Sequence, residues 1–73
     1  MTNNKDINAG IIIIGNEILS GRTKDTNTST LAIWLNSLGI KVEEVRVIPD
    51  VESIIVDTVN LFRKKFKYVF TSG

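Results

Sequence analysis

The sequence predicts an α/β fold in which helices cover both faces of a parallel sheet. Residues 11–14 are four consecutive isoleucines, which are β-branched and too few for a convincing helix, so they indicate a strand with both faces buried. Strand-like runs alternate with amphipathic helical patterns in the order β-α-β-α-β, which is typical of parallel strands joined by right-handed crossovers. A long polar segment follows the isoleucine strand, where open α/β sheets usually place a ligand.

The composition narrows the classes of function. The 73 residues form at most one small domain, and a chain of this size buries only about 60% of its unfolded surface. Hydrophobic residues make up 42% and charged residues 23%, which is an ordinary globular balance. The net charge is +1 and no basic stripe is interleaved with aromatic residues, so we expect no nucleic acid partner.

Cysteine and histidine are both absent, which excludes disulfides, thiolate or histidine metal sites, and Ser–His catalysis. Any chemistry must therefore use carboxylates, hydroxyls, lysines or backbone groups. The polar N-terminus lacks the pattern of a signal peptide, and no apolar run reaches membrane length. We expect a cytoplasmic protein with no membrane contact.

The first strand is expected at residues 9–15, after a polar and frayed N-terminus at residues 1–8. Side chains that satisfy free backbone N–H groups gather at residues 25–30, so a helix should begin there and cover residues 28–38. The apolar face of this helix consists of Leu31, Trp34, Leu35 and Leu38. Gly39 then supplies the left-handed conformation that commonly ends a helix.

A second strand is expected at residues 40–48, where the adjacent Glu43 and Glu44 interrupt the alternation of apolar and polar residues. One face of this strand should therefore meet water. A partly charged strand suits the edge of a sheet, because charge discourages unwanted pairing.

A second helix is expected at residues 51–66, after Pro49 ends the strand, with Asp50 as the cap and Glu52 favourably placed in the first turn. Its apolar stripe consists of Val51, Ile55, Val59, Phe62 and Phe66. Cations gather at its carboxyl end, where the helix dipole favours them. A third strand begins with residues 68–70.

These elements predict a three-layer, partial doubly wound sheet with strand order 2-1-3. The sheet reverses direction between the first and third strands, and ligands bind in the crevice at such a reversal. The loop at residues 15–27 should face residues 71–73 there. The third strand would be an apolar edge with nothing beyond it, which indicates a truncated or split domain whose partner is a second copy, in a homo-oligomer, or a complementing C-terminal half.

The loop after the first strand does not match the common phosphate-binding motifs. Residues 10–15 begin like a P-loop, but Asn16 and Glu17 stand where a lysine and a hydroxyl residue are needed. The G-x-G-x-x-G pattern is absent as well. Gly15 is therefore interpreted as a residue that lets the backbone turn tightly as it leaves the sheet.

The charged residues of this loop each have two interpretations. Glu17 and Asp25 can hold a hard cation such as Mg²⁺ through oxygen ligands, or contact donor groups of a ligand. Alternatively, Glu17 accepts hydrogen bonds from loop N–H groups and Asp25 caps a helix, which is the commonest use of Asp in that position. Arg22 and Lys24 either neutralise a phosphate or lie in solvent.

Residues near the expected helix start and at the chain end complete the candidate site. Asn27 and residues 28–30 stand where free N–H groups favour anions, so capping and phosphate binding are compatible there. The first half of a glycine-containing anion loop is formed by Thr71, Ser72 and Gly73. Trp34 has leucines at helical spacing, which predicts core packing rather than a stacking platform.

Five motifs occur in order along the chain: AGIIIIGNEILSGRT at residues 9–23, KDTN at 24–27, LGI at 38–40, VIPD at 47–50 and VFTSG at 69–73. Together they resemble the amino-terminal half of the MoaB/Mog-type molybdopterin-binding domain. The resemblance is greatest to the version found in CinA-like competence/damage-inducible proteins and at the front of eukaryotic FAD synthases. It covers residues 9–73, nearly the whole chain.

The resemblance implies the family's α/β fold and a ligand-facing rim at residues 15–19 and 25–27, with Pro49 and Asp50 beside them. In the family, a loop of the form Thr-x-Gly-Gly-x-Gly-Pro-Thr followed by Asp holds much of the phosphate. Only its beginning is matched here, by Thr71, Ser72 and Gly73. The resemblance therefore implies a ligand site of which this chain carries one part.

Two functions follow from the resemblance. The first is recognition of a phosphorylated pterin such as molybdopterin, or of a related nucleotide. The alternative is a nucleotide pyrophosphatase acting on ADP-ribose or FAD, in which a divalent cation held by carboxylates such as Glu17 and Asp25 activates water. This isolated chain is not expected to hydrolyse these substrates. An inactive remnant is the third reading. The candidate ligand-binding residues are Gly15, Asn16, Glu17, Arg22, Asp25, Asn27, Thr71, Ser72 and Gly73.

Overall fold

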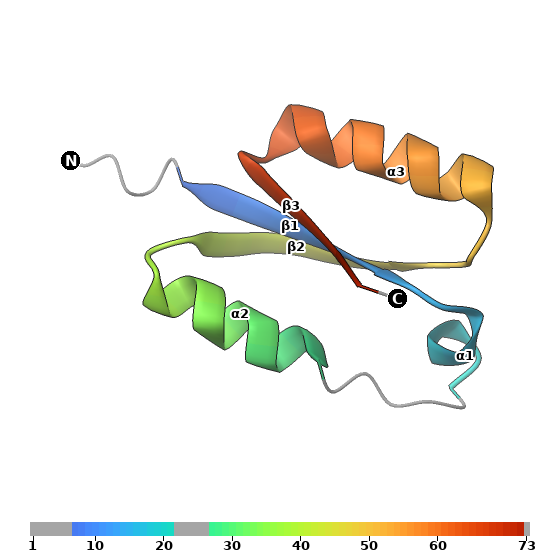
Figure 1. Ribbon diagram of the computed structural model, residues 1–73, viewed down its shortest axis with the longest axis horizontal. Coiled ribbons are helices and arrows are strands. Elements are labelled where there is room, and N and C mark those ends of the chain that lie inside the picture. The colour runs from blue at the N-terminus through green and yellow to red at the C-terminus, as the bar shows by residue number, and fades with distance from the viewer. Residues whose placement is uncertain (1–6, 22–26, 73) are drawn as a thin grey trace.

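The computed structural model describes residues 7–21 and 27–72, and these contain every strand and helix that the sequence predicts. The elements are β1 (Asn8–Ile14), α1 (Asn16–Leu19), α2 (Asn27–Ser37), β2 (Lys41–Ile48), α3 (Glu52–Lys65) and β3 (Tyr68–Ser72) (Figure 1). One element was not predicted, because the four-residue α1 lies in the segment interpreted as a polar loop. β1 begins at Asn8, one residue earlier than expected.

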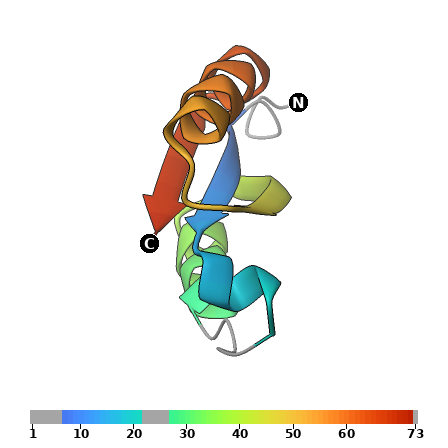
Figure 2. The ribbon, with the colours of Figure 1, turned by 90° about the vertical axis from the view of Figure 1, so that its right-hand side faces the viewer.

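The three strands form one parallel sheet in the order β2-β1-β3, as predicted. Ile14 of β1 pairs with Ile48 of β2, and Ile13 pairs with Ser72 of β3, so the carboxyl ends of all three strands meet at one edge of the sheet. Helix α3 covers one face of the sheet and α2 the other (Figures 1 and 2). The predicted three-layer α/β architecture is therefore confirmed.

The isoleucine strand forms the centre of both cores, because alternate residues point to opposite faces. Ile11 and Ile13 pack with Leu35 of α2, and all three are buried. On the other face, Ile12 packs with Phe62 and Phe66 of α3. Both faces of β1 are therefore apolar, which explains why a continuous hydrophobic run replaces the alternation of a half-exposed strand.

Gly10 sits where α3 approaches the sheet most closely. A Cβ atom added at Gly10 would lie 2.5 Å from Phe62 Cδ2 and 2.6 Å from Phe66 Cδ2. The two rings are packed edge to face, with their centroids 5.2 Å apart. Gly10 is thus required by the space between β1 and the aromatic pair.

The irregular pattern of β2 corresponds to a β-bulge. The pairing register shifts between Ala9 and Gly10, so that Ala9 opposes Val42 and Gly10 opposes Glu44. The extra residue, Glu43, lets Val42 and Val47 both pack against the α2 face although an odd number of positions separates them. The interrupted alternation in the sequence therefore corresponds to this bulge, and β2 is an edge strand, as predicted.

Helix α2 ends as predicted but exposes more of its apolar face. Gly39 has a φ of 84°, and the N–H groups of Gly39 and Ile40 donate to the carbonyls of Asn36 and Leu35, which is a Schellman ending. The prediction that Trp34 packs in the core is wrong, because Trp34 is 54% exposed and Leu38 is also exposed. Only the central part of the predicted face lies over the sheet.

Helix α3 buries its predicted stripe but is not capped by Asp50. Phe62 and Phe66 are buried, and Ile55 and Val59 pack beside them. The N-cap residue is Val51, which makes no side-chain cap hydrogen bond. The predicted capping role of Asp50 is therefore wrong, because its place in the chain lies one residue before the cap.

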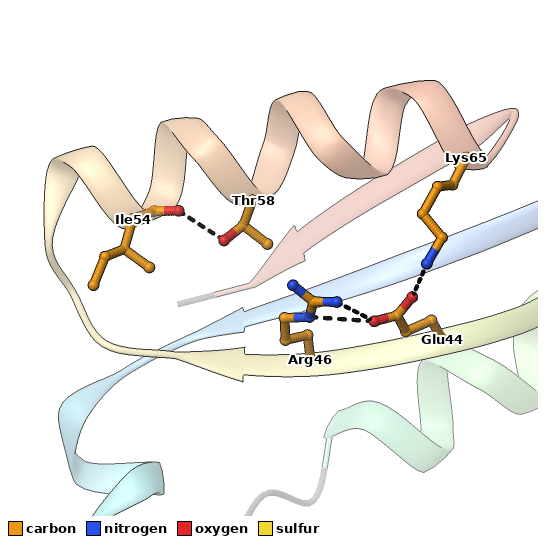
Figure 3. Close-up of polar contacts among 5 residues, drawn as sticks. All are labelled: Glu44, Arg46, Ile54, Thr58 and Lys65. Carbon is orange, nitrogen blue, oxygen red and sulfur yellow. Dashed lines mark hydrogen bonds and ion pairs between the residues drawn. The ribbon is translucent and has the colours of Figure 1, made fainter.

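A charged cluster covers the β2 side of the α3 core (Figure 3). Glu44 accepts hydrogen bonds from Lys65 at 2.7 Å and from Arg46 Nη2 at 2.6 Å. The Arg46 guanidinium lies 5.2 Å from the Phe62 ring centroid, and the Lys65 ammonium lies 5.3 Å from that of Phe66. This cluster ties β2 to the carboxyl end of α3 and shields the aromatic pair from water.

The Glu44 cluster predicts a pH-dependent contribution to stability. Hydrogen bonds from Lys65, and then from Arg46, hold the pKa of the Glu44 carboxyl below its ordinary value of 4.5. Because the folded state has the lower pKa, the contribution is present above pH 4.5 and is lost as the pH falls through the folded-state value. Glu44→Gln should therefore unfold at lower denaturant concentration than the wild type at pH 7, with the difference shrinking below pH 4.5 and in high salt.

Urea unfolding of the two proteins across this pH range provides the measurement. Glu43→Gln removes the same charge from the neighbouring residue while leaving the Glu44 ion pairs intact, so it serves as the matched control. A Glu44→Gln effect that persists unchanged at acid pH would show that the ion pairs are not its source.

No helix in the described part of the chain is both long enough and apolar enough to cross a membrane.

Candidate functional site

The candidate site lies at the edge where the three strands end. Helix α1 follows β1 there, β2 leads into Pro49, and the first turn of α2 lies beside the end of β3, whose Ser72 lines the same pocket as Thr28. Figure 1 shows the strands pointing toward this edge. The position agrees with the general rule that open α/β sheets bind ligands beyond the carboxyl ends of their strands.

Helix α1 continues directly from the central strand. The Gly15 N–H donates to the carbonyl oxygen of Ile48 at 3.0 Å, so the β1–β2 ladder extends one residue past β1. Gly15 has an extended backbone with a φ of 169°, which any residue can adopt, so the predicted need for a tight turn there is wrong. Instead, a Cβ at Gly15 would lie 3.0 Å from a carboxylate oxygen of Glu17, so the glycine makes room for that side chain.

Asn16 joins α1 to the segment after β2. Its Oδ1 accepts a hydrogen bond from the backbone N–H of Asp50 at 3.2 Å. This contact spans 34 positions in the sequence and brings the predicted rim residues Asn16 and Asp50 together. Helix α1 also packs against β2, and Glu17 on this helix is exposed.

A pocket of about 350 Å³ lies on the β3 side of the same edge. Its walls are formed by the start of α2 and by the ends of β1 and β3. The lining residues are Ile13, Thr28, Thr30, Leu31, Trp34 and Ser72. The surface is mostly apolar, with three hydroxyl groups among the side chains, which is the usual character of a small-molecule site.

The structure places four of the predicted site residues in two groups. Asn16 and Glu17 belong to α1 beside β2, whereas Ser72 lines the pocket beside β3 and Thr71 is exposed next to it. Gly15 is buried at the junction between β1 and α1. Asn27 is the first residue of α2. Three predicted residues lie outside the described part of the chain, namely Arg22, Asp25 and Gly73.

No group of three acidic, cysteine or histidine side chains that could hold a metal ion occurs among residues 7–21 and 27–72. The predicted metal ligands are Glu17, which is described, and Asp25, which is not. Carboxylate oxygens are the ligand type that Mg²⁺ prefers, so Glu17 fits such a role chemically. A Glu17–Asp25 cation site remains a prediction.

Two lining residues, Trp34 and Leu31, were assigned to the core by the sequence analysis. The helical spacing of the apolar residues identifies the face of α2 that turns toward the sheet. It does not show how far the sheet extends beneath that face. The exposure of Trp34 could have been inferred from the prediction that the third strand is an uncovered edge of the sheet. An uncovered edge leaves the helix margin next to it exposed, and Trp34 is at that margin.

Known proteins share much of the sequence of this chain. Residues 10–73 match the family model described as a probable molybdopterin binding domain. A probable FAD synthase from Caenorhabditis briggsae is 40% identical over 65 residues, and a CinA-like protein from Flavobacterium psychrophilum is 38% identical over 65 residues. Each match covers 89% of this chain but only 12% and 16% of those relatives, respectively.

The fold is also found in a solved structure. The crystal structure of the protein CinA of unknown function from Thermoplasma acidophilum superimposes with a TM-score of 0.88 at 32% sequence identity. The match covers 97% of this chain and 41% of that chain. A parallel sheet of order β2-β1-β3 with helices on both faces defines the class as an α/β domain of the doubly wound type. Within that class, the chain belongs to the molybdopterin-binding domain family.

Proposed function

We propose that the chain recognises a phosphorylated pterin or a related nucleotide at the carboxyl edge of its sheet. The observation that carries the proposal is the pocket between the start of α2 and the ends of β1 and β3. It lies at the strand-order reversal, where the fold class binds ligands. The family description supports a pterin, and the FAD synthase relatives support a nucleotide.

Two features of the chain suit a phosphate at this edge. The backbone N–H groups in the first turn of α2 and the helix dipole favour an anion beside the pocket. Arg22 and Lys24 belong to the segment that connects α1 to α2, and each supplies a positive charge to it. The proposal places the ring of the ligand in the apolar pocket and its phosphate beside the first turn of α2.

Hydrolysis of a dinucleotide pyrophosphate such as ADP-ribose or FAD is the second candidate function. The exposed Glu17 carboxylate at the same edge favours it, because a divalent cation such as Mg²⁺ could bind there together with Asp25. A bound cation would polarise the pyrophosphate and activate water. Binding ranks ahead of hydrolysis because the pocket offers a ligand a concave, largely apolar surface at this edge.

Calorimetric titration of the purified chain separates these functions. The probes are neopterin triphosphate, ADP-ribose and FAD, each with and without MgCl₂, and AMP is monitored by chromatography. We expect binding of at least one probe and no AMP from the chain alone. Absence of binding by all three would contradict the proposed function.

Glu17→Gln tests the second candidate. AMP production that requires MgCl₂ and is abolished by Glu17→Gln, but not by Glu43→Gln on the β2 bulge, would establish hydrolysis and place the metal at α1. Loss of the carboxylate should lower such turnover by about a hundredfold or more. An unchanged rate would exclude Glu17 as a metal ligand.

The chain spans between an eighth and less than half of the length of the relatives described above. We propose that a partner, either a complementing C-terminal half or a second copy of the chain, pairs along β3. Among the described residues β3 pairs only with β1, so its other side is the surface that such a partner would use.

A further inference from the structure

Trp34 is an exposed aromatic side chain in a concave, apolar surrounding. The residue is 54% exposed although it lines the pocket with the buried Ile13 and the half-buried Leu31. Ile33, the neighbouring residue on α2, is 69% exposed but does not line the pocket. The indole is thus the large apolar surface that the pocket presents to a ligand.

The pocket has the dimensions and polarity for a ring system rather than for a whole dinucleotide. Its volume of about 350 Å³ is at the lower end of the usual range for ligand sites, roughly 300–1,000 Å³. The surface of the pocket is almost entirely apolar, and three of its lining residues, Thr28, Thr30 and Ser72, carry a hydroxyl group. A planar heteroaromatic ring fits this distribution, since its faces are apolar and its edge carries hydrogen-bonding nitrogen and oxygen atoms.

We propose that Trp34 stacks on the heteroaromatic ring of the ligand and so selects phosphorylated compounds that carry such a ring. The inference rests on the proposed function and assigns the ring portion of that ligand to a specific residue. The phosphate portion interacts elsewhere along the carboxyl edge. Trp34 is therefore a specificity-determining residue, and binding of the phosphate portion does not depend on it.

The competing occupant of the pocket is protein. Leu38 on α2 and Tyr68 on β3 are also exposed, so a partner chain that covers this side of the molecule would reach Trp34 as well. The position of the pocket at the strand-order reversal, where open α/β sheets bind small ligands, favours a ring over an apolar side chain of a partner. The experiment includes an outcome for each occupant.

Trp34 is the single tryptophan of the chain, so its fluorescence reports on this pocket alone. Ringed probes, namely neopterin triphosphate and ADP-ribose, are compared with ribose 5-phosphate and pyrophosphate, which lack a heteroaromatic ring. We expect the ringed probes to quench the emission of Trp34 and the ringless probes to leave it unchanged. Emission that responds only to protein concentration would overturn the proposal in favour of a protein occupant.

Calorimetry of variants gives the energetic test. Trp34→Ala should weaken binding of the ringed probes by about five- to 150-fold, the range measured when a stacking aromatic residue is removed, and Trp34→Phe should lie between it and the wild type. Binding of the ringless probes should change by less than about twofold. Ile33→Ala, an exposed apolar truncation on the same helix outside the pocket, is the matched control and should resemble the wild type.

The failures of the two proposals are distinguishable. If the wild type binds ringed and ringless probes and Trp34→Ala weakens neither, the ring lies elsewhere and only the stacking role is overturned. If Trp34→Ala weakens both kinds of probe equally, its effect is structural and the stacking role is also overturned. If the wild type binds no probe at all, the proposed function itself fails.

Discussion

Gly10→Ala is expected to destabilise the chain by about 1–3 kcal/mol, the usual cost of forcing extra atoms into a packed core. The added methyl group would stand 2.5 Å from Phe62 and 2.6 Å from Phe66, and both rings are buried and hold each other in place. A chain of 73 residues has a stability of only roughly 4–11 kcal/mol, so the loss is a large fraction of the total. The melting temperature should fall by about 4–20 °C, measured by circular dichroism.

The cause of the Gly10 effect can be isolated with a second substitution. Phe66→Val removes the Cδ atoms of one of the two obstructing rings, so it should offset part of the Gly10→Ala loss in the double variant. Gly39→Ala is the control, because Gly39 has free space around it and its alanine is disfavoured only by a φ of 84°. Phe66→Val should not rescue Gly39→Ala. Equal rescue of both glycine variants would contradict a steric origin at Gly10.

Much of the fold could be predicted because its signals are local. The isoleucine run has no polar residue to place on either face, so only the central position in a covered sheet satisfies it, and β1 is central. Gly39 ends α2 through the conformation that glycine adopts readily, and the hydrogen bonds around it depend on neighbouring residues alone. The strand order also followed from composition, because Glu43 and Glu44 suit an edge.

The errors arise where a residue depends on contacts far along the chain. Asp50 was interpreted as a helix cap because Asp is common at such positions. In the structure, its backbone N–H instead donates a hydrogen bond to Oδ1 of Asn16 on α1. Helix α1 itself has four residues, which is too short to produce a periodic pattern. Trp34 was assigned to the core because helical spacing reports direction and not the extent of the opposing surface.

The candidate site also combines features that were predicted from the sequence with features that depend on contacts far along the chain. Its position at the carboxyl edge followed from the order of the elements, and Ser72 at the pocket was predicted from that order. The contact between α1 and β2 was not predicted, because it depends on which side of β1 the chain turns toward. Gly15 continues the β1–β2 ladder through Ile48, which directs α1 to the β2 side and leaves the β3 side open.

The two edge strands of the sheet, β2 and β3, differ in how well they are protected against pairing with another chain. On β2 the bulge at Glu43 and the charged side chains of Glu44 and Arg46 discourage pairing with another chain. β3 has no charged residue, and within the described residues it pairs only with β1. Its Tyr68 is 48% exposed and stacks with Phe70 at a centroid distance of 6.4 Å, so an aromatic surface accompanies the open ladder. We therefore expect the chain to associate through β3.

Sedimentation velocity at micromolar concentrations should show a dimer or a larger species, and Tyr68→Lys should weaken self-association by roughly ten- to thirtyfold. In a symmetric dimer each copy loses an aromatic cross-strand contact worth up to about 1 kcal/mol and gains a charge on the edge. Val45→Lys introduces the same charge at a comparably exposed apolar position on β2 and should leave association unchanged, since that edge is already protected. Equal effects of the two lysines would show that net charge and not the β3 edge governs association. A monomeric wild type would instead favour a complementing C-terminal half as the partner that β3 accepts.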